Sequence, residues 1–287
     1  MNDHLIKKMF HTTKLPAISF SLQDIPLKAQ EMVGKMSISG VQPKLSLKLN
    51  GRRSQLTAAA SGGEYILKPQ VPQFRFIPEN ENCCMDIASE LGIDTPPHCL
   101  LPLKDRSLAY VVKRFDRRGE EKIHQENFYQ VLEKRDKYAG SLEEIGKKLK
   151  EISAVPGLDV QLFFERIVFN FLIGNGDGHS QNYSISYDEH GNIRLSPAYD
   201  IVCTKLVLPK GEDSALTLNG KSNQLKRNDF DALADCFNIP AKVRYEKFER
   251  KSNRMRQFVG DSKLQKDFQK KFIEIILSRY ERLRIVF

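Results

Sequence analysis

Two aspartates and one asparagine, in a fixed order along the chain, could together carry out phosphoryl transfer. Asp177 lies in the run NGDGHSQN, Asn182 follows five positions later, and Asp200 ends the run SPAYD. In a phosphotransferase one carboxylate orients the attacking hydroxyl, while an asparagine and a second carboxylate hold magnesium on the nucleotide phosphates. Protein kinases have the same Asp-to-Asn offset and the same order of metal ligands. The three residues therefore predict a nucleotide-dependent phosphoryl-transfer site.

The same run also has a plainer interpretation as two polar turns, because Asn-Gly and Asp-Gly pairs favour turns whatever their chemistry. The second aspartate and a lysine upstream count against that alternative. A zinc site at His179 is not indicated, since no second histidine or cysteine lies near it in the sequence. The oxygen ligands Asn182 and Asp200 suit magnesium instead.

Lys68 is the candidate cation for the nucleotide phosphates. It ends the apolar segment YILK (65–68), which predicts a short buried strand, and a buried charge needs a partner. A phosphate is one such partner. Glu81, on the helix predicted to follow, is another and would form an ion pair with the lysine. The alternative is that Lys68 extends into water at the end of the strand.

Two further segments could bind the rest of a nucleotide. The loop MSISGVQPK (36–44) precedes a predicted hairpin, and its amides and hydroxyls could bind phosphate. It has one glycine, and most Ser-Gly turns bind nothing. The segment VVKRFDRR (111–118) lies where predicted strands give way to helices, which is the place of the adenine-binding hinge in a kinase. A plain surface turn would look similar.

Hydrophobic periodicity predicts a sheet-rich first part and a helical second part, with domains 1–116 and 117–287. Strict alternation before Asn50-Gly51 predicts a hairpin. The other expected strands are 65–68 and 108–113, and the expected helices are 27–32, 80–91, 128–134, 142–152 and 160–173. A small hairpin is expected over 183–187 and 193–196, followed by two or three amphipathic helices in the last ~60 residues.

Composition limits the class of protein. With 287 residues, 40% of them hydrophobic, the chain can form one large domain or two lobes. It has no run of the roughly 20 apolar residues that cross a bilayer and no signal-peptide pattern, so we expect a cytoplasmic protein without a membrane partner. Five cysteines without a Cys-x-x-Cys pair predict reduced thiols. The net charge of +9 permits binding to nucleic acid or to an acidic protein surface without showing either.

Taken together, these segments resemble the HipA family of bacterial serine/threonine kinases. The resemblance extends from Ser37 to Asp200, and more loosely to the C-terminus. It is carried by SISGVQPKLSL (37–47), YILKP (65–69), NEN…ASELG (80–92), KRFDR (113–117), HQENF (124–128), NGDGHSQN (175–182) and PAYD (197–200).

The resemblance implies an α+β, two-lobed, protein-kinase-like fold with a sheet-rich N-lobe and an all-helical C-lobe, using ATP and Mg²⁺. By position, Asp177 matches the catalytic aspartate, Asn182 and Asp200 the metal ligands, and Lys68 the phosphate-binding lysine. The implied ATP-binding residues are Ser37, Ile38, Ser39, Gly40, Val41, Gln42, Lys68, Lys113, Phe115, Asp116, Gln125 and His179.

Ser37 matches the family's autophosphorylated serine, and Ser39 offers a second site. A phosphate there brings about −2 charge into a site for ATP phosphates, and should repel the nucleotide. Paired serines, and only 36 residues before Ser37, resemble the short form, HipT, of the tripartite HipBST toxin–antitoxin system. The implied partners are a HipS-like small antitoxin and a HipB-like DNA-binding protein. The implied substrate is an aminoacyl-tRNA synthetase, the tryptophanyl enzyme for the short form, whose phosphorylation arrests translation.

Two other functions remain open at the level of sequence. One is a small-molecule phosphotransferase on the same scaffold, since no acceptor pocket can be identified. The other is a non-catalytic, nucleotide-binding component of a repressor complex, which the positive charge favours and the presence of all the catalytic positions disfavours. No recognisable helix-turn-helix stands out, so any DNA contact is expected only indirectly, through a partner.

Overall fold

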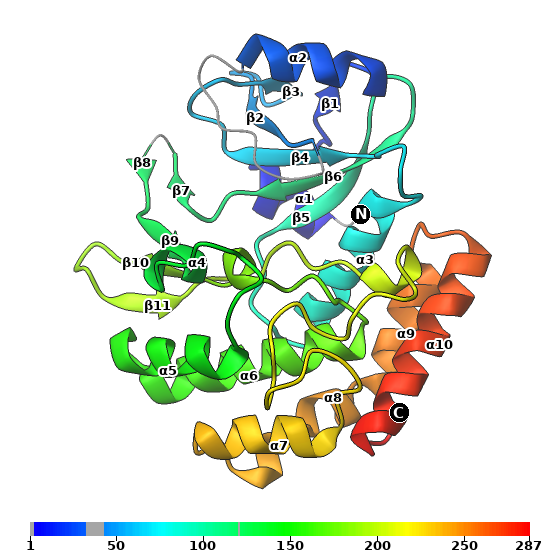
Figure 1. The fold of residues 1–287 in the computed structure, drawn as a ribbon. Helices are drawn as coiled ribbons and strands as arrows, with labels where there is room; N and C mark the ends of the chain where they lie inside the picture. Colours follow the sequence, from blue (N-terminus) through cyan, green and yellow to red (C-terminus); the bar gives the residue numbers. More distant parts are fainter. Residues whose placement is uncertain (1–2, 33–42, 120) are drawn as a thin grey trace. The chain divides into compact units, whose positions relative to one another are not determined.

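The structure is a computed structural model that describes residues 3–32, 43–119 and 121–287. The chain divides into two compact units, one made of Met1–Asn82 with Pro96–Lys122 and the other of Cys83–Thr95 with Ile123–Phe287 (Figure 1). The domain limits expected from the sequence, 1–116 and 117–287, stay a prediction. The second unit also takes in an excursion, 83–95, from within the first predicted domain.

The first unit is built on a six-stranded sheet whose strand order is β1-β3-β2-β4-β6-β5. Among the described residues of this sheet, β1 pairs with β3 in parallel and the other neighbouring strands are antiparallel. The strands are β1 (Ala17–Ile18), β2 (Leu45–Leu49), β3 (Gln55–Ala58), β4 (Tyr65–Pro69), β5 (His98–Pro102) and β6 (Leu108–Lys113). The strands expected at β2, β4 and β6 are confirmed. A two-stranded ribbon, β7 (Arg117–Arg118) with β8 (Glu121–Lys122), ends this unit.

The core of the first unit joins the sheet to the start of the chain. Leu45, Leu47 and Leu67 point into it from the strands, together with Met9 and Phe10 from α1 (Asp3–Phe10). The Tyr65 hydroxyl donates to the Met9 carbonyl at 2.6 Å, which ties the end of α1 to β4. α1 was not expected from the sequence. The short helix expected at 27–32 is present as α2 (Ile25–Met32), and α3 (Ile77–Glu90) begins three residues before its expected start.

The second unit is mainly helical. Besides residues 83–90 of α3, it contains the helices α4 (Phe128–Val131), α5 (Leu142–Ile152), α6 (Pro156–Leu172), α7 (Arg227–Cys236), α8 (Glu246–Arg250), α9 (Ser252–Asp261) and α10 (Lys266–Leu283). α6 is buried along most of its length, as its nearly continuous apolar sequence predicts. The C-terminal part holds α7, α8, α9 and α10 where two or three helices were expected, because the chain breaks near Pro240 and again at Lys251.

The expectation of an all-helical second part is wrong. A three-stranded antiparallel sheet with the order β11-β10-β9 belongs to this unit. Its hairpin, β10 (Ser184–Tyr187) with β11 (Ile193–Leu195), was expected from the sequence. The third strand, β9 (Gln125–Asn127), is too short to show an alternating pattern, so only tertiary pairing with β10 reveals it.

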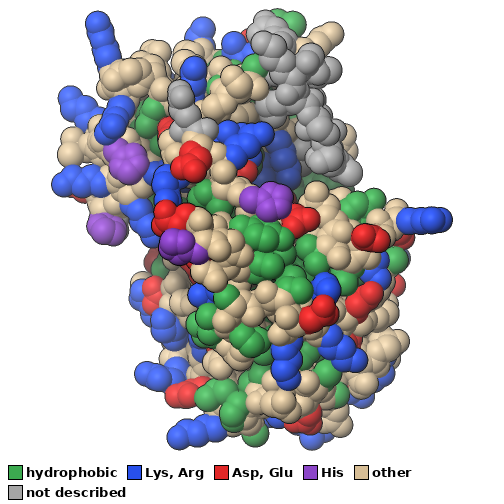
Figure 2. All heavy atoms as spheres, turned by 90° about the vertical axis from the view of Figure 1, so that its left-hand side faces the viewer, with side chains coloured by type: hydrophobic (Ala, Val, Ile, Leu, Met, Phe, Trp, Pro, Cys, Tyr) green, Lys and Arg blue, Asp and Glu red, His purple; other side chains and the backbone are tan. Residues whose placement is uncertain are grey.

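Neither the charge distribution on the face drawn in Figure 2 nor the cysteine thiols indicate a particular function. On the face drawn in Figure 2, lysines and arginines stand among acidic and neutral side chains. Cys83, Cys84, Cys99 and Cys203 are buried and Cys236 is exposed. Burial raises the pKa of Cys203 to about 12, which leaves it a poor nucleophile at neutral pH. Among the described residues, no helix combines the length and the apolar character that a membrane span requires.

Candidate active site

Lys68 and Glu81 form a buried ion pair inside the first unit. Lys68 Nζ lies 2.5 Å from Glu81 Oε1, and the two residues are 4% and 1% exposed. β4 supplies the lysine and α3 the carboxylate. Burial lowers the pKa of Lys68 to about 8, even though the charge of Glu81 opposes that shift. The lysine therefore does not extend into water, and it lies beside a carboxylate that holds its position.

A second lysine shares this environment. Burial lowers the pKa of Lys44, just before β2, while the charge of Glu81 raises it. The charge of Lys44 in turn contributes to lowering the pKa of Lys68. The carboxylate of Glu81 thus faces two partly desolvated cations, an arrangement suited to binding an anion such as a phosphate. Lys44 was not among the predicted site residues, although it lies in the loop motif that was considered.

The expected hinge segment, 111–118, extends from the end of β6 to β7 in the first unit. Lys113 Nζ lies 2.8 Å from Nε2 of His11, and as the cation of the pair it is the donor. Asp116 accepts two hydrogen bonds from Arg114, at 2.8 and 2.5 Å. Burial alone would raise the pKa of Asp116, but the hydrogen bond and charge of Arg114 outweigh it and hold that pKa below its usual range. Phe115, between them, is half-buried.

Asp177 lies in the second unit, on the turn 173–179 that follows α6, and it is exposed although most of this turn is buried. Its amide donates to Asn175 Oδ1 at 3.1 Å, and the Asn175 side chain donates to Asn170 Oδ1 at 3.2 Å. Asn170, within α6, donates in turn to the Tyr183 hydroxyl at 3.1 Å. This chain of hydrogen bonds fixes the backbone of the turn to a buried helix while its carboxylate faces water.

Two neighbouring residues, Lys137 and Tyr138, also contact this turn. The sequence analysis did not single out either of them. The Tyr138 hydroxyl donates to Asp177 Oδ1 at 3.1 Å, and the Tyr138 ring meets the His179 ring edge-on at 5.3 Å between centroids. Burial, with the charge of Asp177, raises the pKa of Tyr138. Lys137 Nζ lies 3.0 Å from His179 Nε2, and the Lys137 carbonyl accepts from the Ser180 amide and hydroxyl. No periodic pattern marks 137–138, so only the structure could identify them.

The candidate metal ligands lie on two segments that hydrogen bonds join. Asn182 ends the short helix η2 (Ser180–Asn182), and its Oδ1 accepts the His179 amide at 3.1 Å. Tyr199, next to Asp200, donates to the Gln181 carbonyl at 2.9 Å and contacts the Ser184 hydroxyl. The Asp200 backbone has a φ of 56°, an uncommon value for a residue other than glycine, and such residues concentrate at functional sites.

These ligands fit magnesium by their chemistry. A carboxylate and an amide oxygen are the hard donors that Mg²⁺ takes, usually with water and substrate phosphates completing the octahedron. The Asn182 side-chain oxygen has a second lone pair beyond the one that accepts from His179. Gln125, the remaining candidate of this unit, is half-buried in β9, where its backbone pairs with Ser186.

The predicted residues that the structure describes fall into two sets, one in each unit. The first unit holds Lys68, Glu81, Lys113, Phe115 and Asp116, and the second holds Gln125, Asp177, His179, Asn182 and Asp200. The phosphate-loop residues lie outside the described residues, and these are Ser37, Ile38, Ser39, Gly40, Val41 and Gln42. The two proposed autophosphorylation sites, Ser37 and Ser39, fall in that group.

Comparison with known sequences identifies the family. Residues 36–264 match the HipA-like C-terminal domain, and the chain belongs to this family. A Haemophilus influenzae protein named "Putative kinase" is 35% identical over 202 residues, which cover 65% of this chain and 58% of that protein. The serine/threonine-protein kinase toxin HipA of Shewanella oneidensis is 23% identical over 260 residues, covering 82% of this chain and 59% of that protein. The chain spans 45% to 59% of the length of the curated relatives it matches.

Two solved structures share the fold. HipA of Shewanella oneidensis, in complex with HipB and its operator DNA, superposes with a TM-score of 0.70 at 24% identity, covering 87% of this chain and 65% of that one. The Helicobacter pylori proinflammatory kinase CtkA gives a TM-score of 0.59 at 16% identity, covering 87% and 92%. The expected kinase-like α+β fold is confirmed, with the small sheet of the second unit as its correction. The assignment to the short form, HipT, stays a prediction.

Proposed function

We propose that the chain is an ATP- and Mg²⁺-dependent protein serine/threonine kinase. The observation that carries the proposal is the buried Lys68–Glu81 ion pair, at 2.5 Å, in a chain of the HipA-like family. In protein kinases a strand lysine paired with a helix glutamate binds the nucleotide phosphates. Burying such a pair brings little stability by itself, because desolvation offsets much of the attraction, so a functional reason for it is needed.

Each residue then has a task. Lys68 binds a phosphate oxygen, and Asn182 with Asp200 would hold the magnesium, which offsets phosphate charge when bound. Asp177 Oδ1 accepts from Tyr138, and Oδ2, which has no hydrogen bond among the described residues, is left for the substrate hydroxyl. As the serine oxygen bonds to phosphorus and the bond to the ADP oxygen breaks, the hydroxyl proton passes to Asp177.

We further propose the narrower role that the family resemblance implies. The kinase would act as the toxin of a toxin–antitoxin system, phosphorylating an aminoacyl-tRNA synthetase, with the tryptophanyl enzyme as first candidate. Ser37 and Ser39 would be its autophosphorylation sites. A HipS-like small protein and a HipB-like DNA-binding protein would be its partners. The Shewanella oneidensis HipA structure, which contains HipB and operator DNA, supports the second of these.

Intact mass after incubation with Mg-ATP tests the proposal. The wild-type chain, purified without phosphate, should gain one or two phosphates, and a variant carrying Ser37→Ala with Ser39→Ala should gain none. If the double variant is modified as fully as the wild type, the loop serines are not the sites. If purified aminoacyl-tRNA synthetases accept phosphate, the substrate class is supported. A chain that neither binds ATP nor transfers phosphate refutes the kinase proposal.

A second candidate, a DNA-associated role without catalysis, is favoured by the net charge of +9 and by the HipB–operator complex of the Shewanella oneidensis relative. Operator DNA should then be bound tightly only when a HipB-like protein is added. Tight, specific binding by the isolated chain would instead favour a direct DNA-binding function.

A further inference from the structure

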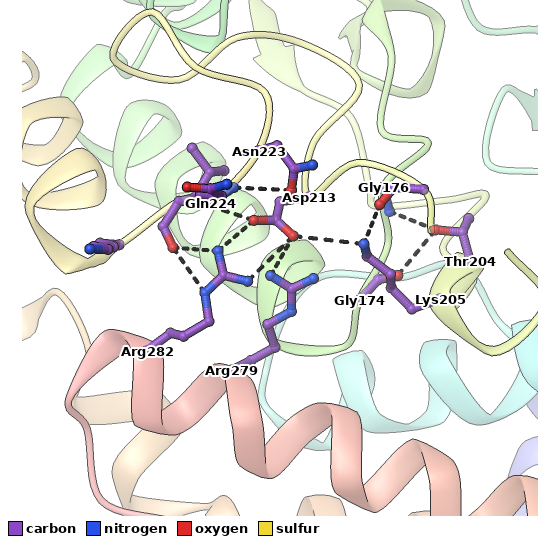
Figure 3. Close-up of polar contacts among 12 residues, drawn as sticks. Gly174, Gly176, Thr204, Lys205, Asp213, Asn223, Gln224, Arg279 and Arg282 are labelled. Atoms are coloured by element: carbon purple, nitrogen blue, oxygen red, sulfur yellow. Dashed lines mark hydrogen bonds and ion pairs between the residues drawn. The ribbon is translucent and has the colours of Figure 1, made fainter. Parts of the chain in front are cut away.

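A segment that follows Asp200 returns to contact the turn that carries Asp177. The Thr204 hydroxyl accepts from the Gly176 amide at 2.8 Å and donates to the Gly174 carbonyl at 3.1 Å (Figure 3). One side chain thus bridges the residues on both sides of Asn175. The Lys205 amide adds a second hydrogen bond to the Gly174 carbonyl, at 3.1 Å.

The two segments also pack closely through their backbones. A Cβ added at Gly176 would lie 2.4 Å from the Glu212 carbonyl oxygen, so the peptide of the turn touches the peptide of the returning segment. Gly174 has a φ of 73°, and a Cβ there would meet Ile275 of α10 at 2.9 Å. A side chain at Gly176 would require a backbone shift, and one at Gly174 would be strained by the positive φ as well as crowded by Ile275. The turn therefore cannot change shape independently of the segment that runs from Thr204 to Leu225.

Asp213 anchors that segment to α10. It is 5% exposed, and its two oxygens meet Arg279 Nη1 at 2.6 Å and Arg282 Nη2 at 2.5 Å. Oδ2 also accepts the Leu225 amide at 3.1 Å, while Arg282 donates to the Leu225 carbonyl at 2.7 Å. Burial alone would raise the pKa of Asp213, but the hydrogen bonds and charges of the two arginines outweigh it and keep that pKa below the usual range.

The same two arginines reach the helix that leads into the turn. The Arg279 and Arg282 guanidinium groups lie 4.5 and 5.0 Å from the centroid of the Phe171 ring, in α6, at cation–π distance. The charges of Asp213 and Arg279 are largely removed from water. Replacing Asp213 would therefore leave the buried arginine charge without its carboxylate partner, which is strongly unfavourable. The ion pairs of Asp213 with Arg279 and Arg282 therefore fix the 204–225 segment against the end of α6 that leads into the Asp177 turn.

We propose that Thr204 and Asp213 are positioning residues, which set the backbone of the Asp177 turn through the 204–225 segment. This inference rests on the proposed kinase function of Asp177. In many kinases the segment after the metal-binding aspartate is ordered only when an added phosphate pairs with arginine. Here the buried Asp213 carboxylate already pairs with two arginines, Arg279 and Arg282, without an added phosphate. Phosphorylation of this segment is then unnecessary for an ordered catalytic turn.

The test compares Thr204→Val with Thr204→Ser and with a matched control, Ser262→Ala, in the 287-residue chain. Thr204→Val removes the bridging hydroxyl at nearly constant volume, and Thr204→Ser retains it. Ser262 makes the same kind of bridge elsewhere in the second unit, since its hydroxyl donates to the Val259 carbonyl and accepts the Leu264 amide. Steady-state phosphoryl transfer, nucleotide affinity and amide hydrogen exchange are measured for each variant.

We expect Thr204→Val to lower kcat by about ten- to a hundredfold, the range that a small misplacement of catalytic groups costs. Its ATP affinity should stay within about twofold, and the Gly176 amide should exchange at least about tenfold faster because it has lost its acceptor. Thr204→Ser should restore both properties, and Ser262→Ala should leave kcat unchanged.

A second pair of variants tests the anchor. Arg282→Gln should speed exchange of the amides in 174–178 and lower kcat, by less than Thr204→Val because Arg279 keeps its ion pair. Arg250→Gln, which removes an exposed arginine paired with Glu246 on α8, is the matched control and should do neither.

The outcomes separate the inference from the function it rests on. If the wild type transfers no phosphate, the proposed function fails, while exchange at Gly176 still decides whether Thr204 holds the turn. Unchanged Gly176 exchange and kcat within twofold in Thr204→Val would overturn the positioning role. An equal loss of kcat in Ser262→Ala would overturn it too, because the effect would then follow from lost hydroxyl bridges in general.

Discussion

Lys68 and Asp177, the two charged residues on which the proposed chemistry depends, are held in opposite ways. Lys68 lies in a strand of the first unit, pairs with Glu81 of a helix, and is 4% exposed. Asp177 lies on a turn of the second unit and is exposed. Its direct side-chain partner among the described residues is Tyr138, which is itself 47% exposed.

The difference follows from what each residue has to do. The electrostatic attraction between a cation and a phosphate is stronger where water is excluded. The ion pair that compensates the burial of the cation then also fixes its position. A carboxylate that must reach the hydroxyl of another molecule has to stay at the surface. Its position can be fixed only through its backbone and its neighbours, which here are Asn175, Thr204 and Tyr138.

Asp177→Asn should show the largest effect on turnover. The amide keeps the shape and the backbone contacts of the turn but does not take a proton at neutral pH, so kcat should fall by about 10²- to 10⁴-fold, the usual contribution of general acid–base catalysis. Nucleotide affinity should hardly change, since Lys68 is untouched. Steady-state phosphoryl transfer together with titration of ATP by calorimetry measures both. Near wild-type turnover would remove Asp177 from its catalytic role.

The sequence was informative where function and regular structure coincide. Strand β4 and helix α3 were expected from periodicity, so the position of Lys68 and its pairing with Glu81 followed as an explicit alternative. The roles of Asp177, Asn182 and Asp200 stay predictions, and they rest on the order and spacing of the three residues in the sequence. These are local patterns, and elements such as α5 came out at the expected residues, Leu142–Ile152.

The parts that the sequence did not indicate depend on contacts between distant residues. Tyr138 is 39 positions from Asp177, and Asp213 is 69 positions from Arg282. Nothing in the local pattern of an exposed tyrosine or of an aspartate in a loop marks such a partner. The strand β9 was missed for the same reason, because its three residues become a strand only by pairing with β10. Hydrophobic periodicity reports local structure and does not reveal contacts between residues that are distant in the sequence.

Glu81→Gln should affect stability more than any surface change. It leaves the buried Lys68 charge without its carboxylate, and breaking such a pair costs about 3–5 kcal/mol in the free energy of unfolding. Glu246→Gln, which removes an exposed carboxylate 3.4 Å from Arg250, should cost less than about 1 kcal/mol. Urea unfolding of the two variants measures the contrast. If both variants lose the same free energy of unfolding, burial does not make the Lys68–Glu81 pair more important for stability than the exposed Glu246–Arg250 pair.

ATP affinity should depend on pH through Lys68. Because its pKa is lowered to about 8, the lysine is mostly charged below about pH 7 and loses its charge as the pH rises through 8. The dissociation constant for ATP should therefore rise between pH 7.5 and 9.5, by up to about tenfold per pH unit once the lysine is mostly neutral. Lys68→Arg, whose guanidinium stays charged over this range, should bind with little pH dependence. Calorimetric titrations at fixed ionic strength compare the two, and parallel pH profiles would exclude Lys68 as the titrating group.

Tyr138→Phe should show the smallest effect, and it tests whether an exposed carboxylate needs its neighbour. The change removes the hydroxyl that donates to Asp177 Oδ1 but keeps a ring to pack against His179. A hydrogen bond with a net worth of about 0.5–1.5 kcal/mol corresponds to a two- to tenfold fall in kcat, with KM for ATP unchanged. Tyr187→Phe is the matched control, because it removes a hydroxyl that donates to Glu126 at 2.5 Å in the same unit, and it should leave kcat unaltered. If both variants keep wild-type kcat, the backbone contacts from Asn175 and Thr204 suffice to position Asp177, and the comparison with Lys68 then reduces to side-chain burial against backbone anchoring.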